Sequence, residues 1–243
     1  MPQFSDDIYL GTALVPSTSG SNPSPMTQGV GPLGRVYIWD VVPLTLQTNG
    51  LSTTATPGAA GNLTLTAGTG VTLRVRPDGT NEYVLDTPRC VTVTAAGANA
   101  ATFTIYGYDL YGQAMSQLIA APSTSTVATT KAFKTVTRIA ISAAAGSAIT
   151  AGFNDKLGLP LRATDVGYVT SVKWAATLAA DAGTFVAADT TSPATTSTTD
   201  VRGCYTPSSA ANGTRRLVMT IALPALAVGP DATRAGAVGV DQV

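Results

Sequence analysis

The side chains that most often carry out catalysis are scarce in this sequence. Histidine is absent, which removes Ser-His-Asp and Cys-His catalysis, proton transfer by imidazole and the commonest metal ligand. Glu82 is the single glutamate, so the other thirteen of the 14 acidic residues are aspartates. A carboxylate pair could hydrolyse a glycoside, but many of these aspartates adjoin turn residues, as in Asp78-Gly79, where Asp bonds the nearby backbone. The sequence therefore predicts a protein that is not an enzyme.

The sequence also contains no recognisable motif for binding a metal ion or a cofactor. The EF-hand pattern D-x-[DN]-x-[DN]-G is absent, and the glycine-rich residues 58–61 lack the Lys-Ser/Thr of a nucleotide-binding loop. Cys90 and Cys204 have no CxxC spacing, and each stands in a predicted strand or at its edge, which favours a small core residue over a disulfide. We therefore expect no cofactor and no dedicated metal site. A Ca²⁺ site assembled from loops in the folded chain stays an open alternative.

Three tyrosines, Tyr106, Tyr108 and Tyr111, lie close together in the sequence. They could form a stacking platform for a sugar or a nucleobase. They could also flank a β-turn, with their rings at the sheet edge and their hydroxyls in water. The first interpretation would make the chain a host-glycan-binding module, and it requires exposed, roughly coplanar rings beside a carboxylate. We favour the second.

The chain carries little charge. Charged residues make up 12% of the 243 positions, against roughly 25% in an average globular protein. The formal net charge is zero, and Thr and Ala each provide about a sixth of the chain. The hydrophobic fraction of 44% is enough for one large or two small folded units. A surface of hydroxyl and methyl groups fits a protein whose surface is largely occupied by neighbours.

Nucleic acids and membranes are not predicted partners. Binding to phosphates needs clustered Lys and Arg, and the basic near-pairs Arg74/Arg76 and Arg215/Arg216 are interpreted as solvated strand positions. No run of about 18 apolar residues is present to cross a bilayer. The acidic residues 1–7 lack the pattern of a signal peptide. We therefore expect synthesis and folding in a cytoplasm.

Short β runs separated by Gly, Pro, Asn and Asp turns predict an all-β fold, an antiparallel sandwich or barrel. Residues 90–106 are the clearest predicted hairpin, because apolar and Thr residues alternate strictly on both sides of a loop. Residues 63–66 and 71–76 alternate around a turn at 67–70, and residues 77–80 form a further turn. Helices of convincing length are not predicted, since Thr, Val and Ile disfavour them.

One predicted strand is irregular. In residues 131–142 the apolar Phe133 and Val136 are three positions apart, whereas Thr137, Ile139 and Ile141 alternate at period two. A bulge or a short helical turn before the strand would explain the change of spacing.

Four regions are predicted along the chain. They are an extended N-terminal arm at 1–35, a first β domain at 36–160, a second β region at 161–228 and an irregular C-terminal tail at 229–243. The last three could be one body or two β-subdomains with a tail, since the boundary near residue 160 is soft.

The arm is the predicted partner-binding segment. Its Pro, Ser and Gly content prevents it from burying enough apolar area to order itself. Apolar residues nevertheless interrupt it, and they are predicted to dock onto another protein. These residues are Ile8, Tyr9, Leu10, Leu14 and Val15. A plain disordered tail is the alternative.

Several segments resemble a β-domain that recurs among structural proteins of tailed bacteriophages. Residues 86–94 read DTPRCVTVT, residues 101–115 read ATFTIYGYDLYGQAM and residues 131–139 read KAFKTVTRI. Residues 153–161, 183–191 and 199–203 extend the likeness, which covers roughly residues 86 to 215. The resemblance implies a non-enzymatic virion component. Its size and composition favour a head decoration or cement protein that binds the major capsid protein or other virion proteins. A tail or collar component is the alternative.

Self-association is expected as well. Edge strands of a Thr-rich antiparallel sheet are sticky unless covered, and the chain has only four lysines to protect them. Its low net charge also gives little electrostatic protection, and closed symmetry is the usual way to cover such edges. The resemblance favours a trimer over a dimer, because phage head-binding proteins commonly occupy three-fold positions. The implied location is the virion, at the phage head, after synthesis in the host cytoplasm.

Overall fold

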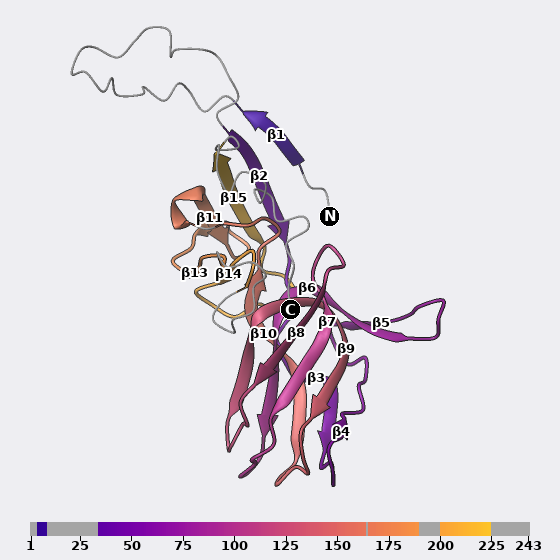
Figure 1. Ribbon diagram of the computed structural model, residues 1–243. Helices are drawn as coiled ribbons and strands as arrows, with labels where there is room; N and C mark the ends of the chain where they lie inside the picture. Colours follow the sequence, from indigo (N-terminus) through magenta and orange to yellow (C-terminus); the bar gives the residue numbers. More distant parts are fainter. Residues whose placement is uncertain (1–3, 9–33, 164, 190–199, 225–243) are drawn as a thin grey trace, which may run out of the picture.

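The computed structural model describes residues 4–8, 34–163, 165–189 and 200–224. Within these ranges the chain is all-β, and its antiparallel sheets form a curled half-barrel with sandwich-like packing, which confirms the predicted fold class (Figure 1). The one helical element there is a single 3-10 turn, Val166–Tyr168. The predicted tail at 229–243 lies outside the described residues, as does most of the predicted arm.

The smaller sheet has five strands in the order β1-β2-β15-β11-β12. They are β1 (Phe4–Ile8), β2 (Gly34–Val41), β11 (Val169–Trp174), β12 (Ala179–Ala180) and β15 (Leu217–Pro224). β15 pairs antiparallel with both β2 and β11, so strands from the start and the end of the chain share one sheet. Leu217, Met219 and Ile221 alternate along it and are all buried, as expected of a strand with one face on a core.

The larger sheet has ten strands, seven of them in the order β13-β14-β10-β6-β9-β7-β8, while β3, β4 and β5 pair with β10, β9 and β6. The strands are β3 (Gln47–Ala55), β4 (Gly61–Asn62), β5 (Val71–Val75), β6 (Asn81–Ala95), β7 (Phe103–Tyr108), β8 (Ala114–Ile119), β9 (Thr126–Ile141), β10 (Ile149–Gly158), β13 (Thr184–Val186) and β14 (Cys204–Thr206). The long central strands β6 and β9 make the sheet continuous from the projecting β5 to the lower end of the body (Figure 1).

The pairing of these strands differs from the predicted hairpins. β6 and β7 supply the two predicted strands of residues 90–106, but β9 lies between them and pairs with both. Likewise β5 pairs with β6 across the predicted turn at 77–80, and not with residues 63–66. The alternation of apolar side chains identifies the buried face of a strand. It does not determine which strand pairs with it, because any strand with a matching face can occupy the adjacent position.

The predicted irregularity in β9 is a break in the strand register. Tyr106 pairs with Arg138 but Gly107 pairs with Val136, so one residue of β9, Thr137, is extra relative to β7. A bulge of this kind bends the strand and re-aims the side chains beside it. Here Val136 and Ile139 stay in the core while Arg138 is exposed.

Two large hydrophobic clusters and one small cluster lie in the described interior. The first lies within the larger sheet and contains Phe103, Phe133 and Phe153, the second contains Trp39, Trp174 and residues of β15, and the small one contains Cys90 and Cys204. Strand pairing crosses the boundary predicted near residue 160, because β2 pairs with β15 and β10 pairs with β14. The two predicted β regions therefore share hydrogen-bonded sheets.

Residues 4–8 of the predicted arm form β1, which pairs antiparallel with the chain's own β2 in a register from Phe4↔Ile38 to Ile8↔Gly34. The sequence did not predict this strand, because its short, acidic segment has no clear alternation. Of the predicted docking residues, Tyr9, Leu10, Leu14 and Val15 lie outside the described residues, and Ile8 is described only through its backbone pairing.

Candidate protein-binding site

The three tyrosines do not share one surface. Tyr106 and Tyr108 line a cavity of about 600 Å³, whereas Tyr111 is not among its lining residues. The hydroxyl of Tyr111 instead donates to the backbone oxygen of Pro160 at 2.5 Å, and the guanidinium of Arg202 lies 5.4 Å from the centre of its ring. A three-ring platform is therefore not assembled.

Arginines cover the two tyrosines that do lie together. The guanidinium of Arg138 is 3.9 Å from the ring centre of Tyr106, and that of Arg76 is 5.1 Å from the ring centre of Tyr108. Arg76 also donates to the Tyr108 hydroxyl at 2.9 Å. Such cation–π contacts occupy ring faces that a sugar would need for stacking. The arrangement makes a basic, hydroxyl-lined cavity.

The cavity lies between the turn of the β5–β6 hairpin and the partly exposed face of β7, β8 and β9. Thr80 comes from the hairpin turn, Tyr106 and Tyr108 from β7, Ser116 from β8 and Arg138 from β9. Tyr106 is the cross-strand neighbour of both Arg138 and Ser116, so register alone places the three side chains in one row.

The β5–β6 hairpin projects from the body as a two-stranded ribbon (Figure 1). Past Val71, every residue of the ribbon up to Asn81 is exposed. Leu73 is 46% exposed and Val75 is 60% exposed. A two-stranded hairpin by itself is marginally stable in water, and large apolar side chains at its end lose that exposure when a partner covers them. The hairpin is therefore a candidate docking element of the described chain.

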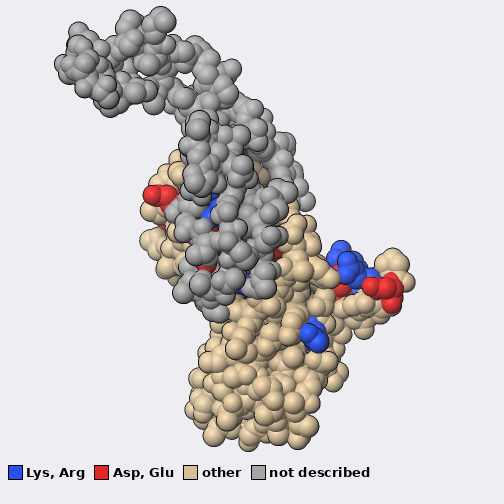
Figure 2. Space-filling model, in the orientation of Figure 1, with Lys and Arg blue, Asp and Glu red and all other residues tan. Residues whose placement is uncertain are grey.

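The single glutamate stabilises this hairpin. Glu82 on β6 is 1% exposed and pairs with Arg74, its cross-strand neighbour, and with Arg76, whose Nε lies 3.2 Å from Glu82 Oε1. The sequence had suggested solvated strand positions for both arginines, and both are indeed exposed. Figure 2 shows basic and acidic side chains gathered on the projecting hairpin, while the body below it is nearly free of charge on this face.

A second exposed apolar segment connects β2 to β3. Val42, Leu44 and Leu46 are each more than a third exposed, at alternate positions of an extended stretch. The side chain of Leu44 lies at the base of the hairpin, because its Cδ1 is 3.6 Å from the point that a Cβ atom on Gly70 would occupy. Sequence reasoning missed this surface because three alternating apolar residues predict burial.

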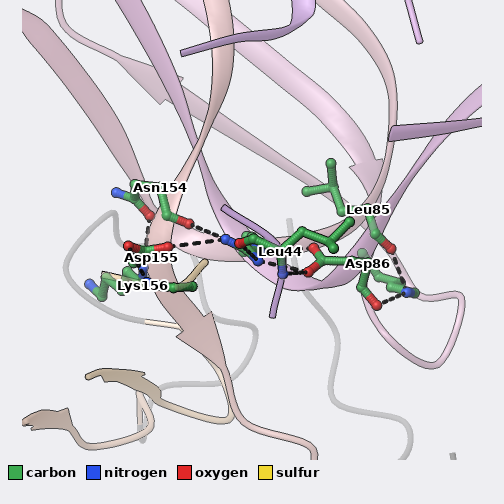
Figure 3. Close-up of polar contacts among 9 residues, drawn as sticks. Leu44, Leu85, Asp86, Asn154, Asp155 and Lys156 are labelled. Atoms are coloured by element: carbon green, nitrogen blue, oxygen red, sulfur yellow. Dashed lines mark hydrogen bonds and ion pairs between the residues drawn. The ribbon is translucent and has the colours of Figure 1, made fainter. Parts of the chain in front are cut away.

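Arg89 holds the backbone of this exposed segment, and Figure 3 shows its partners Leu44, Asp86 and Asp155 close together. Arg89 is fully buried, and its guanidinium donates to both oxygens of Asp86, at 2.8 and 2.7 Å, and to the backbone oxygen of Leu44 at 2.6 Å. A third partner is Asp155, whose Oδ1 accepts from Arg89 at 3.2 Å. Asp86 in turn accepts the backbone N–H of Leu44 at 2.7 Å. Both polar backbone groups of Leu44 are thus held while its side chain faces outward.

Burial shifts the pKa of two groups at this network. Desolvation raises the pKa of Asp155, although the Ala211 N–H and Arg89 oppose the shift. Desolvation also lowers the pKa of Lys134, which donates to the backbone oxygens of Leu85 and Asp86 at 2.5 and 2.9 Å. Two cations and two carboxylates therefore share this interior site, a structural arrangement of paired charges.

A second buried charge group connects the turn after β7 to the segment before β14. Arg202 donates to Asp109 Oδ2 at 2.8 Å, with both side chains almost completely buried. Asp109 also accepts the backbone N–H groups of Tyr111 and Gln113, which shapes the turn. Asp200 accepts the Ala132 N–H at 2.8 Å, and burial raises its pKa. This group joins the two ends of the larger sheet.

The cysteines are free and lie together in the core, as the sequence suggested for small core residues. Both thiols contact the backbone oxygen of Thr130, at 3.6 Å for Cys90 and 3.8 Å for Cys204. Contact with Cys90, followed by burial, raises the pKa of Cys204 well above its usual range. Low reactivity is expected of protonated thiols in such surroundings.

The described residues contain no cluster of three or more Cys, Asp or Glu side chains suited to a metal ion. No helix in those ranges has the length and hydropathy of a membrane span.

Comparison with known proteins adds no relative. No protein-family model matches the chain, and no curated protein or solved structure is significantly similar to it.

Proposed function

We propose that the chain is a non-enzymatic structural component of a tailed-phage virion, a head decoration or cement protein that binds across subunits of the major capsid protein. One observation carries the proposal: a charge-poor all-β body presents a projecting hairpin whose apolar Leu73 and Val75 are 46% and 60% exposed. Such a surface suits contact with protein subunits. The sequence resemblance supplies the kind of assembly.

Cementing would follow from burial across subunit boundaries. A ligand that binds only the assembled lattice stabilises that lattice by mass action, and specific interfaces bury on the order of 1,200–2,000 Å². The hairpin and the Val42–Leu46 segment together offer apolar contact on two neighbouring elements. A trimer at three-fold positions would give each hairpin a defined neighbour.

A tail or collar component is the second candidate within the same class, since a projecting hairpin can dock onto any ring of subunits. The host-glycan-binding alternative has less support, because Arg76 and Arg138 cover the rings of Tyr108 and Tyr106 and Tyr111 lies elsewhere.

The test is binding to phage heads that lack the protein. Purified chain is mixed with such heads and separated by sedimentation, and the heads are then heated or exposed to low ionic strength. We expect saturable binding and a higher rupture temperature. Binding to isolated tails and not to heads would select the tail candidate, and binding to neither would contradict the virion role.

A further inference from the structure

The cavity beneath the hairpin contains an arginine without a carboxylate. Arg74 and Arg76 both pair with Glu82, whereas Arg138 has no carboxylate within ion-pair distance among the described residues. Arg138 is exposed and is held over the Tyr106 ring at 3.9 Å. A guanidinium positioned by a ring still offers N–H donors at its rim, in the fork that matches a carboxylate.

The bulge in β9 explains how this arginine reaches the cavity. The register shift at Thr137 separates the buried Val136 from Arg138, so that Arg138 stands beside Tyr106 on the partly exposed face. Bulges are often found where a strand must re-aim one side chain toward a site. The sequence predicted an irregularity within residues 133–136, whereas the extra residue of β9 relative to β7 is Thr137.

The rest of the lining suits a peptide. A volume of about 600 Å³ is much larger than one carboxylate needs and falls in the range of about 300–1,000 Å³ usual for ligand sites. Hydroxyls of Thr80, Tyr106 and Ser116 can bond backbone or side-chain groups, while the exposed Ala114 adds apolar contact. The charges of Arg74 and Arg76 on the hairpin are balanced by the carboxylates of Asp78 and Glu82. Arg138 adds one further positive charge, so the surroundings of the cavity are slightly basic.

We propose that this cavity binds an acidic segment of a partner protein, whose Asp or Glu carboxylate pairs with Arg138. The inference rests on the proposed function in taking that partner to be a virion protein. An acidic glycan is the competing ligand of similar charge. It is disfavoured because the tyrosine faces are already covered by guanidinium groups.

The experiment uses the full chain and fluorescein-labelled hexaglutamate, with a Gly-Ser peptide of equal length and an oligogalacturonate as comparisons. Fluorescence polarisation is measured at low salt, where exposed charges are least screened. The variants are Arg138→Glu and Arg138→Lys. The matched control is Lys173→Glu, which makes the same charge reversal at an exposed position of β11 in the other sheet. Thermal unfolding verifies that each variant is folded.

Hexaglutamate should bind the wild-type chain, and Arg138→Glu should weaken that binding by at least about tenfold, as expected for a lost charge-assisted pair. Arg138→Lys should lose several-fold because lysine lacks the two-pronged geometry, and Lys173→Glu should bind as the wild type does. Equal binding by wild type and Arg138→Glu, equal losses in Arg138→Glu and Lys173→Glu, or binding of oligogalacturonate alone would each overturn the inference.

Head binding separates this inference from the proposed function. If wild-type chain binds heads and Arg138→Glu binds them equally well, the cavity is not the docking site while the virion role stands. If wild type binds no virion part but hexaglutamate binds through Arg138, the virion role fails and the acidic-peptide site remains.

Discussion

At the scale of single residues, buried arginines determine which surface the protein presents. Arg89 donates directly to the backbone oxygen of Leu44. The backbone N–H of Leu44 is held indirectly, because it donates to Asp86, the ion-pair partner of Arg89. The exposed apolar side chain of Leu44 is therefore a consequence of a buried ion network. A surface fixed in this way loses little conformational entropy when a partner binds.

Removing Arg89 should unfold this arrangement. Arg89→Ala leaves the carboxylates of Asp86 and Asp155 without their buried partner, and such a change costs about 3–5 kcal/mol. Arg216→Ala breaks the exposed pair with Asp40 and should cost no more than about 1 kcal/mol. Urea denaturation at neutral pH measures both. Equal losses in the two variants would contradict the structural role given to Arg89.

The pair of Asp40 and Arg216 predicts a pH dependence. A hydrogen bond from Arg216 lowers the pKa of Asp40 below its ordinary 3.8, against a smaller effect of desolvation. Because the folded-state pKa is depressed, the stabilisation is present above the unfolded pKa and disappears as pH falls through the folded pKa. The difference in urea midpoint between wild type and Asp40→Asn should therefore be constant from pH 7 to about pH 5 and shrink towards pH 2.5. A difference that does not change with pH would contradict it.

At the scale of elements, the sequence predicts strands and faces better than it predicts neighbours. Val91, Val93, Phe103 and Ile105 are all buried, as their alternation required. Yet β9 lies between the two strands that carry them. The pairing depends on long-range packing, which local alternation does not encode.

The candidate site also combines features that the sequence predicts with features that it does not. The sequence predicted the turn at 77–80 from Pro and Gly, and it predicted an irregularity in β9 but placed it before Val136, whereas the bulge is at Thr137. The projection of β5 was not predictable, because Leu73 and Val75 have the alternation of a half-buried strand and only the tertiary arrangement leaves them exposed. The predicted docking residues of the arm remain a prediction.

The hairpin can be tested separately from the body. The double variant Leu73→Ser, Val75→Ser removes exposed apolar surface, so its free energy of unfolding should stay within about 0.5 kcal/mol of wild type. Its binding to heads should be lost, because the apolar contact is gone. Leu118→Ser on β8 is the control, since Leu118 is just as exposed but lies outside the hairpin. If the double variant assembles as wild type does, the hairpin is not the docking element.

At the scale of the whole molecule, low charge and open sheet edges favour association. The formal net charge of zero gives no long-range repulsion, and edge strands such as β8 and β13 end the larger sheet. Sedimentation velocity over a hundredfold range of concentration should show a discrete closed oligomer, with a trimer expected. A monodisperse monomer throughout would leave assembly on a lattice as the remaining route.

We propose that the chain is a structural subunit of a phage virion, placed on the head. Cryo-electron microscopy of the phage that encodes the chain tests this role. We expect density for the all-β body outside the capsid lattice, with the β5–β6 hairpin buried against a neighbouring subunit. A complete virion map without this chain, supported by its absence from the mass spectrum of the purified particles, would contradict the virion role.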